Sequence, residues 1–229
     1  MNLAVITARG GSKRIPRKNI KEFCGKPIIA YSIEAALNSN CFDEVMVSTD
    51  DDEIAEISKK YGAKVPFMRS KETADDFATT AEVLFEVVNQ YRKNKKYFKY
   101  LCCLYPTAPF LTRERLLEAF IKLKNNSALS VVFPVVKYSF PVQRALHFKN
   151  ERIHFLDSAH ALTRSQDLTP SYHDAGQFYW MRTVSFLKNK QLLQGEMEAI
   201  ILPETHVQDI DMLSDWQLAE YKYEYWHSR

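Results

Sequence analysis

The stretch from residue 3 to residue 19 constrains this chain more than any other. Residues 3–8 form an almost entirely apolar run, which predicts a strand buried on both faces, as in a parallel sheet. Gly10 and Gly11 follow, and glycines let a backbone turn sharply and approach a ligand closely. Five cations lie around these glycines within ten residues, namely Arg9, Lys13, Arg14, Arg17 and Lys18. An open α/β sheet binds its ligand at the carboxyl ends of its strands, so this basic loop (residues 9–18) predicts a polyphosphate site.

Basic runs are more often solvated surface loops than binding sites. Two features oppose that interpretation here: the glycine pair, and Pro16, which stiffens a loop whose cations repel one another unless an anion is present. The general phosphate motifs Gly-x-Gly-x-x-Gly and Gly-x-x-x-x-Gly-Lys-[Ser/Thr] are both absent from the sequence. Charge and position therefore indicate phosphate, whereas no general motif identifies the ligand.

Length, charge and cysteine spacing narrow the class of protein. A chain of 229 residues with 46% hydrophobic content suits one α/β domain with its own core. The net charge of +3 argues against nucleic acid as a partner, because nucleic-acid binding usually needs a more basic surface. No apolar stretch reaches membrane-spanning length, and the N-terminus lacks the basic segment of a signal peptide. The four cysteines show no metal-site spacing, so we expect reduced thiols in a cytoplasmic protein.

Strand and helix patterns alternate along the rest of the chain. Strands are predicted at residues 44–49, 65–68, 100–104, 129–136 and 199–202, and helices at 27–37, 54–61, 84–91, from 112 and at 213–225. One aspartate of the run 50–52 is expected to cap the helix that follows, and only Asp50 is expected near a ligand. Residues 137–172 break the pattern and contain a hairpin-like stretch around Asn150, which indicates an insertion on an α/β core.

The acidic motif Gln208-Asp209-Ile210-Asp211 follows the last predicted strand. Two acids one residue apart on an extended segment point to the same side, where they can share a hard cation. The alternative is that they cap the final helix. A similar alternative holds for Thr79 and Thr80, one of which can cap the helix after them.

Residues 8–19 resemble the nucleotide-binding signature of the cytidylyltransferases that activate nonulosonic (sialic-type) acids. The likeness extends to residues 76–80 and 208–211, while residues 140–146 and 173–180 resemble the pseudaminic acid branch more than the sialic acid branch. Tyr105 and Met212 depart from the family pattern, which usually has glutamine and threonine there. The resemblance implies a Rossmann-like three-layer nucleotidyltransferase fold of the α/β class with a mostly parallel sheet. It also implies a single cytidylyltransferase domain over residues 1–229, with residues 137–172 as a small insertion subdomain for specificity or dimerisation.

The resemblance further implies transfer of CMP from CTP to the anomeric hydroxyl of a nonulosonic acid, with pseudaminic acid as the first expectation. It assigns catalysis to Arg9, Lys13, Lys18 and Asp211, and the Mg²⁺ cofactor to Asp209 and Asp211. Nucleotide binding is assigned to Ala8, Arg9, Gly10, Gly11, Ser12, Lys13, Lys18, Asn19, Arg69 and Thr80. Sugar binding is assigned to His173, Gln177, Tyr179 and Arg164, whose guanidinium can grip a carboxylate with two bonds. The expected assembly is a homodimer.

Two other functions remain open at this point. The same core motifs would serve a CMP-N-acetylneuraminate or CMP-legionaminate synthetase, since they do not select the acid sugar. A protein with this fold could also bind a nucleotide without catalysis, because a fold does not determine an activity.

Overall fold

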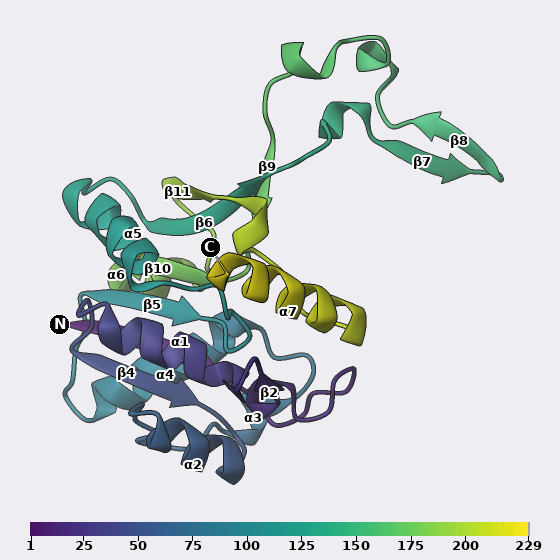
Figure 1. Ribbon diagram of the computed structural model, residues 1–229. Coiled ribbons are helices and arrows are strands. Elements are labelled where there is room, and N and C mark those ends of the chain that lie inside the picture. Colours follow the sequence, from purple (N-terminus) through teal and green to yellow (C-terminus); the bar gives the residue numbers. More distant parts are fainter. Residues whose placement is uncertain (229) are drawn as a thin grey trace.

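A seven-stranded sheet forms the centre of the computed structural model, which describes residues 1–228 (Figure 1). Its strands are β1 (Asn2–Thr7), β4 (Glu44–Ser48), β5 (Tyr100–Leu104), β6 (Val131–Lys137), β9 (Tyr172–Asp174), β10 (Phe178–Arg182) and β11 (Met197–Leu202). The order is β11-β6-β10-β5-β1-β4, and β9 pairs with β6. Ladders β1–β4, β1–β5 and β6–β11 are parallel, whereas β10 runs antiparallel between β5 and β6. The predicted α/β class and mostly parallel sheet are confirmed.

Helices cover both faces of the sheet because its strands are apolar on both faces. They are α1 (Ile28–Asn38), α2 (Asp52–Lys60), α3 (Lys71–Ala74), α4 (Thr80–Lys93), α5 (Arg113–Asn125), α6 (Thr183–Asn189) and α7 (Leu213–His227). In β1, Ala4 and Ile6 pack in the cluster that contains residues of α1, α2 and α5, while Leu3 and Val5 pack with residues of α4 and α6. In the described part of the chain, no helix has the length and hydropathy that crossing a bilayer requires.

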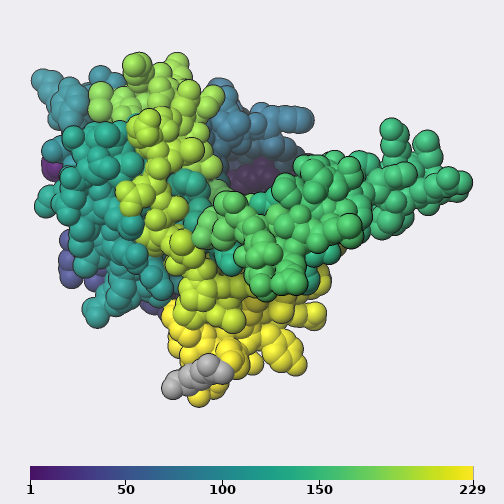
Figure 2. Space-filling model, turned by 90° about the horizontal axis from the view of Figure 1, so that it is seen from above, coloured from purple at the N-terminus to yellow at the C-terminus, as the bar shows by residue number. Residues whose placement is uncertain are grey.

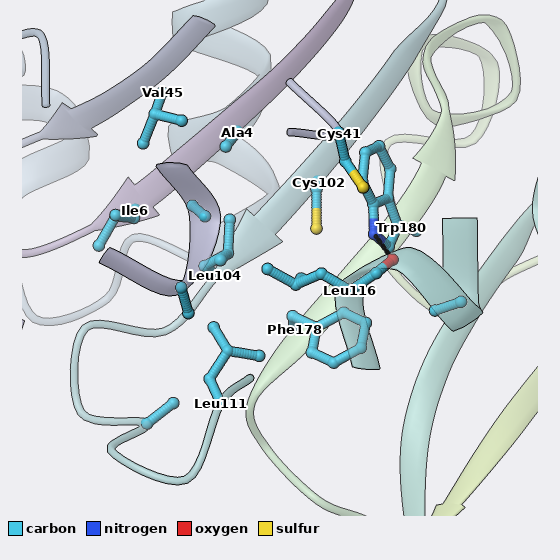
Figure 3. Close-up of a cluster of buried hydrophobic side chains, with 14 of the residues drawn as sticks. Ala4, Ile6, Cys41, Val45, Cys102, Leu104, Leu111, Leu116, Phe178 and Trp180 are labelled. Atoms are coloured by element: carbon cyan, nitrogen blue, oxygen red, sulfur yellow. Dashed lines mark hydrogen bonds between the residues drawn. The ribbon is translucent and has the colours of Figure 1, made fainter. Parts of the chain in front are cut away.

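The larger core cluster is organised around Trp180 of β10 (Figure 3). Its ring stacks on Phe42 and Phe120, with centroid separations of 4.6 and 4.7 Å. Its indole N–H donates to the carbonyl oxygen of Leu116 at 3.1 Å, so the polar atom of this buried ring has a partner. Phe178 lies in the same cluster, and Tyr179 between them points to the opposite face, as strand alternation predicts.

Side-chain caps decide where three of the helices begin. Asp51 caps α2 by accepting from the backbone N–H of Ile54 at 2.9 Å, which confirms a cap within the acidic run. Thr112 caps α5 as predicted, and Thr79 forms a capping box with Glu82 at the start of α4. Because Thr79 is the cap, the hydroxyl of Thr80 is not needed for capping.

The strand predicted at residues 65–68 is wrong. Only an isolated bridge between Met46 and Lys64 continues the sheet beyond β4. Pro66 lacks a backbone N–H and cannot donate to a ladder, so pairing stops there. The chain instead returns to the end of β4, where the N–H of Arg69 donates to the carbonyl oxygen of Thr49 at 2.8 Å.

Residues 138–171 leave the sheet between β6 and β9 and project from the body as an arm (Figures 1 and 2). The arm carries the antiparallel hairpin of β7 (Leu146–Lys149) and β8 (Arg152–Phe155), which confirms the hairpin predicted around Asn150. Asn150 and Glu151 at its turn have φ angles of 49° and 61°. A two-residue turn with both φ angles positive matches the twist of the strands it joins.

Candidate active site

A cavity of about 520 Å³ lies at the carboxyl ends of β1 and β5. Its lining comes from the ends of both strands, the basic loop and the start of α4: Thr7, Arg9, Ser12, Lys13, Arg14, Lys18, Asn19, Thr80, Tyr105, Pro106 and Thr107. Figure 2 shows purple atoms of the N-terminal part in a recess between the body and the green arm. The basic loop therefore lines this first cavity, at the sheet edge where open α/β folds bind ligands.

The first two cations of the basic loop share one carboxylate. Arg9 Nη1 lies 2.6 Å from Asp76 Oδ1, and Lys13 Nζ pairs with the other oxygen of Asp76. The Lys13 side chain is 78% exposed and the Arg9 side chain 37%, so both heads are accessible from the cavity. Neither residue contributes to the core, and both are free to exchange their partner for a ligand.

The other end of the basic loop is tied to the acidic motif. Arg14 donates both Nη atoms to the two oxygens of Asp211, at 2.8 and 2.9 Å. Lys18 donates to the carbonyl oxygen of Ile210 at 2.6 Å, and its Nζ lies 3.8 Å from Asp211 Oδ1. Burial lowers the pKa of Lys18, and the nearby charges of Asp211 and Asp209 oppose that shift. These contacts place the acidic motif against two cations of the basic loop.

Arg17 anchors the loop rather than facing the cavity. It pairs with Asp51, the cap of α2, at 2.5 Å and also with Glu53, and these carboxylates raise its pKa further. Gly10 approaches the same carboxylate so closely that an added Cβ would lie 2.7 Å from Asp51 Oδ2. Asp50 accepts from the N–H of Gly10 at 2.9 Å, so Asp50 shapes the loop at the edge of the site.

Some of the remaining residues predicted to bind the nucleotide line the cavity, whereas others lie outside its lining. Ser12, Asn19 and Thr80 line the cavity, and Asn19 also donates to the carbonyl oxygen of Arg9 at 2.8 Å. Ala8 is buried at the end of β1, and Gly11 is exposed with open space around its α-carbon. Arg69 is 9% exposed and bonds the side chain and carbonyl oxygen of Ser48, so it braces the end of β4 outside the cavity lining.

A second cavity of about 460 Å³ adjoins the first, and Tyr105 lines both. It is lined by Tyr105, Val136, His173, Asp174, Ala175, Gly176, Tyr179, Glu204, Val207, Gln208, Asp209 and Lys222. The ring of Tyr105 meets that of Tyr179 edge to face at 5.6 Å, and Tyr179 donates to Asp174 Oδ2 at 2.6 Å. Burial raises the pKa of both tyrosines, so their hydroxyls stay protonated hydrogen-bonding groups at neutral pH.

The structure separates the four predicted sugar residues. His173 and Tyr179 line the second cavity. Gln177 is 3% exposed and donates to the carbonyl oxygen of His206 at 2.8 Å, and it is not part of the cavity lining. Arg164 lies exposed on the projecting arm and lines neither cavity within this chain.

The acidic motif does not cap the final helix. Asp215, inside the first turn of α7, accepts from the backbone N–H groups of Asp211 and Met212 at 3.0 and 2.7 Å. The carboxylates of Asp209 and Asp211 therefore take no part in capping α7, and that of Asp211 is paired with Arg14 instead, so the capping alternative is wrong. No cluster of three or more His, Cys, Asp or Glu side chains suited to a metal occurs within residues 1–228. Asp209 lines the second cavity, and Asp211 contacts Arg14 and Lys18 of the first. Mg²⁺ commonly binds one or two carboxylates together with substrate phosphates, so this pair fits that ion.

The sequence motifs do not assign Arg14 or Lys222 to the site, although Arg14 lines the first cavity and Lys222 lines the second. Nor do they single out Asp76, which lines neither cavity but pairs with Arg9 and Lys13. Lys222 donates to the carbonyl oxygen of Val207 and to Gln208, and it crosses from α7 to the segment before Asp209. Such long-range partners leave no local pattern in the sequence, whereas Thr7 could have been found because it ends one of the two strands that form the site.

The profile of the family described as Cytidylyltransferase matches residues 3–224. The chain belongs to the cytidylyltransferase family. It is 42% identical over 227 residues to a pseudaminic acid cytidylyltransferase of Campylobacter jejuni, with 99% of this chain and 97% of that protein covered. It is 32% identical to the CMP-N,N'-diacetyllegionaminic acid synthase of Legionella pneumophila, over 95% of this chain and 94% of that protein.

A solved structure of CMP:2-keto-3-deoxy-manno-octonic acid synthetase complexed with CTP superimposes with a TM-score of 0.70. That likeness covers 100% of this chain and 99% of the other at 19% identity, so it shows a shared fold. The predicted nucleotidyltransferase fold is confirmed, and this cytidylyltransferase is a nucleotidyltransferase enzyme.

Replacing Arg9 or Lys13 by alanine should weaken binding of a nucleoside triphosphate by about tenfold or more, because each removes a charge-assisted contact to phosphate. The melting temperature should change little, since exposed cations contribute little to stability. Calorimetric titration with CTP measures the affinity. Lys59→Ala, which removes an exposed cation of α2, is the matched control. Parent-like affinity in both variants would exclude the basic loop from phosphate binding.

Proposed function

We propose that this cytidylyltransferase transfers CMP from CTP to the anomeric hydroxyl of a nonulosonic acid, with pseudaminic acid as the preferred acceptor. One observation carries the proposal: two cavities meet at Tyr105, one lined with cations and the other with mixed polar and aromatic groups. The identity of 42% to a pseudaminic acid cytidylyltransferase, over nearly all of both chains, supports that acceptor.

The two cavities suit an in-line displacement. CTP would lie in the first cavity with its phosphates on Arg9, Lys13 and Lys18, and the acid sugar in the second. The hydroxyl oxygen attacks the α-phosphorus, and the bond from that phosphorus to the oxygen that bridges it to the β-phosphate breaks. Pyrophosphate leaves with the electron pair of that bond, and the hydroxyl loses its proton. Phosphoryl transfer depends mainly on positioning and charge stabilisation, which a cation-lined cavity provides.

Mg²⁺ is the proposed cofactor, held by Asp209 and Asp211. When bound, it would neutralise phosphate charge and act as a Lewis acid on a phosphoryl oxygen. The carboxylate of Asp211 is paired with Arg14, and Lys18 lies beside it, which supports this assignment because both cations line the first cavity.

Sugar recognition is assigned to the second cavity and to the arm. His173 and Tyr179 would contact the acceptor, whereas Gln177 is not part of the cavity lining. Arg164 would meet the acceptor's carboxylate only from the arm of another copy or after movement of its own arm, because it lines neither cavity here.

Pyrophosphate release tests the reaction directly. The purified chain, CTP and Mg²⁺ are combined with pseudaminic acid, legionaminic acid or N-acetylneuraminic acid, and kcat/KM is compared. We expect the highest value for pseudaminic acid, by about tenfold or more, the size of effect that a few pocket contacts produce. A preference for another acid would overturn the acceptor while preserving the reaction. Absence of release with every acid would favour a protein that binds nucleotide without catalysis.

Asp211→Asn tests the metal assignment. The substitution removes a charge from a hard-cation site, so activity at ordinary Mg²⁺ should fall by about a hundredfold and recover in part with excess Mg²⁺ or Mn²⁺. Mn²⁺ binding in the presence of CTP, measured by electron paramagnetic resonance, should weaken in parallel. Folding should be retained because the Asp211 side chain is 43% exposed. Asp215→Asn, which changes the cap of α7 instead, controls for loss of local structure. Unchanged Mn²⁺ binding in Asp211→Asn would exclude the site.

A cytoplasmic homodimer is the proposed assembly. All four cysteines are free thiols, which suits a reducing compartment. The arm exposes large apolar side chains, including Phe140, Leu146, Phe148, Ile153 and Leu162, with exposures from 52% to 99%. Large exposed apolar side chains gathered on one segment are typical of interaction sites, and a second copy would cover them.

Light scattering on the purified chain should give the mass of two chains. Phe148→Glu should shift the mass toward one chain, because it places a charge in the proposed interface. Tyr97→Glu, at a 62% exposed aromatic residue outside the arm, is the matched control and should keep the dimer. A single-chain mass for the parent would contradict the proposal.

A further inference from the structure

Asp76 makes the most direct contact with the phosphate-binding cations, yet it belongs to neither cavity lining. One oxygen of its carboxylate binds Arg9 at 2.6 Å and the other binds Lys13. Arg9 also donates to the carbonyl oxygen of Asp75 at 3.1 Å. A single carboxylate thus bridges the two cations that would hold the leaving pyrophosphate.

The segment that carries Asp76 is fixed at its ends, and its tip is held to the rest of the protein by the contacts with Arg9 and Lys13. At the first end, the side chain of Glu86 accepts from the N–H of Ser70 at 3.0 Å. At the other end, Thr79 is held by the capping box of α4. The tip lies at the surface, where the ring of Phe77 is 90% exposed. The tip can therefore move away from the basic loop without disturbing the core.

Phosphate competes strongly for the same two cations. The side chain of Asp76 is 37% exposed, and ion pairs at such exposure are weak. A polyphosphate carries more charge than one carboxylate and offers several strong acceptor oxygens. The hydrogen bonds and charges of Lys13 and Arg9 lower the pKa of Asp76, so its carboxylate is ionised at neutral pH and competes throughout turnover.

We propose that Asp76 is a positioning residue that occupies the place of the nucleotide's phosphates between turnovers. Its carboxylate pairs with Arg9 and Lys13 while no nucleotide is bound. The triphosphate displaces it from both cations, and the ion pairs form again when pyrophosphate leaves. This inference rests on the proposed function for its role in the reaction, although the competition itself requires only phosphate binding. A merely structural role for Asp76 makes the opposite prediction, because loss of a support would weaken phosphate binding.

Asp76→Asn separates these roles, since it keeps the shape of the side chain and removes its charge. Calorimetric titration with pyrophosphate, in the absence of divalent metal ions, should show binding about three- to tenfold tighter than in the parent, the range expected for losing exposed ion pairs. Glu72→Gln removes an exposed carboxylate from the same segment, outside the pairs with the basic loop, and should leave affinity unchanged. In a Lys13→Ala background, Asp76→Asn should have a smaller effect, because the two residues interact.

Kinetics supply the second readout. In Asp76→Asn, inhibition by the product pyrophosphate should become stronger and KM for CTP should fall, without a matching rise in kcat. Unchanged or weaker pyrophosphate binding in a variant that melts like the parent would overturn the inference. If the parent binds pyrophosphate but transfers no CMP to any acid sugar, the proposed function fails, while tighter binding by Asp76→Asn still supports the competition.

Discussion

Mutual neutralisation of charge is the constraint on which the site depends. The basic loop carries five cations within ten residues, an arrangement that repels itself. In the structure, Asp51 and Glu53 pair with Arg17, Asp76 pairs with Arg9 and Lys13, and Asp211 pairs with Arg14. These acids come from the segments around α2, before α4 and before α7, so the loop is held in shape by three distant parts of the chain.

The ion pairs of the basic loop have different roles because their exposure to solvent differs. The pair of Arg17 and Asp51 is partly buried, and its carboxylate also caps α2, so breaking it would disturb both the loop and a helix. The pairs of Asp76 and Asp211 are more exposed, and their partners line the first cavity. The least exposed carboxylate, that of Asp51, therefore anchors the loop. The more exposed carboxylates of Asp76 and Asp211 are the ones that a ligand could displace.

The sheet explains why a second cavity lies beside the first. β10 enters antiparallel between β5 and β6, and β9 before it pairs His173 and Asp174 with the carboxyl end of β6, in the wall of the second cavity. Tyr179 of β10 then faces Tyr105 at the end of β5. The antiparallel strand thereby brings polar side chains next to the first cavity.

The sequence by itself determined strands β1, β4, β5, β6 and β11, most helices and the basic loop, because apolar periodicity and charge density are local properties; it did not predict β9 or β10. It located the acidic motif but could not decide between capping and metal binding, since that choice depends on whether Asp215 supplies the cap. It predicted a strand at residues 65–68 that a proline and the return of Arg69 to β4 prevent. Only the tertiary structure decided the partners of the cations, the exclusion of Gln177 and Arg164 from the cavity walls, and the position of Asp76. Those outcomes depend on contacts between residues far apart in the chain, and such contacts leave no periodic signal in the sequence.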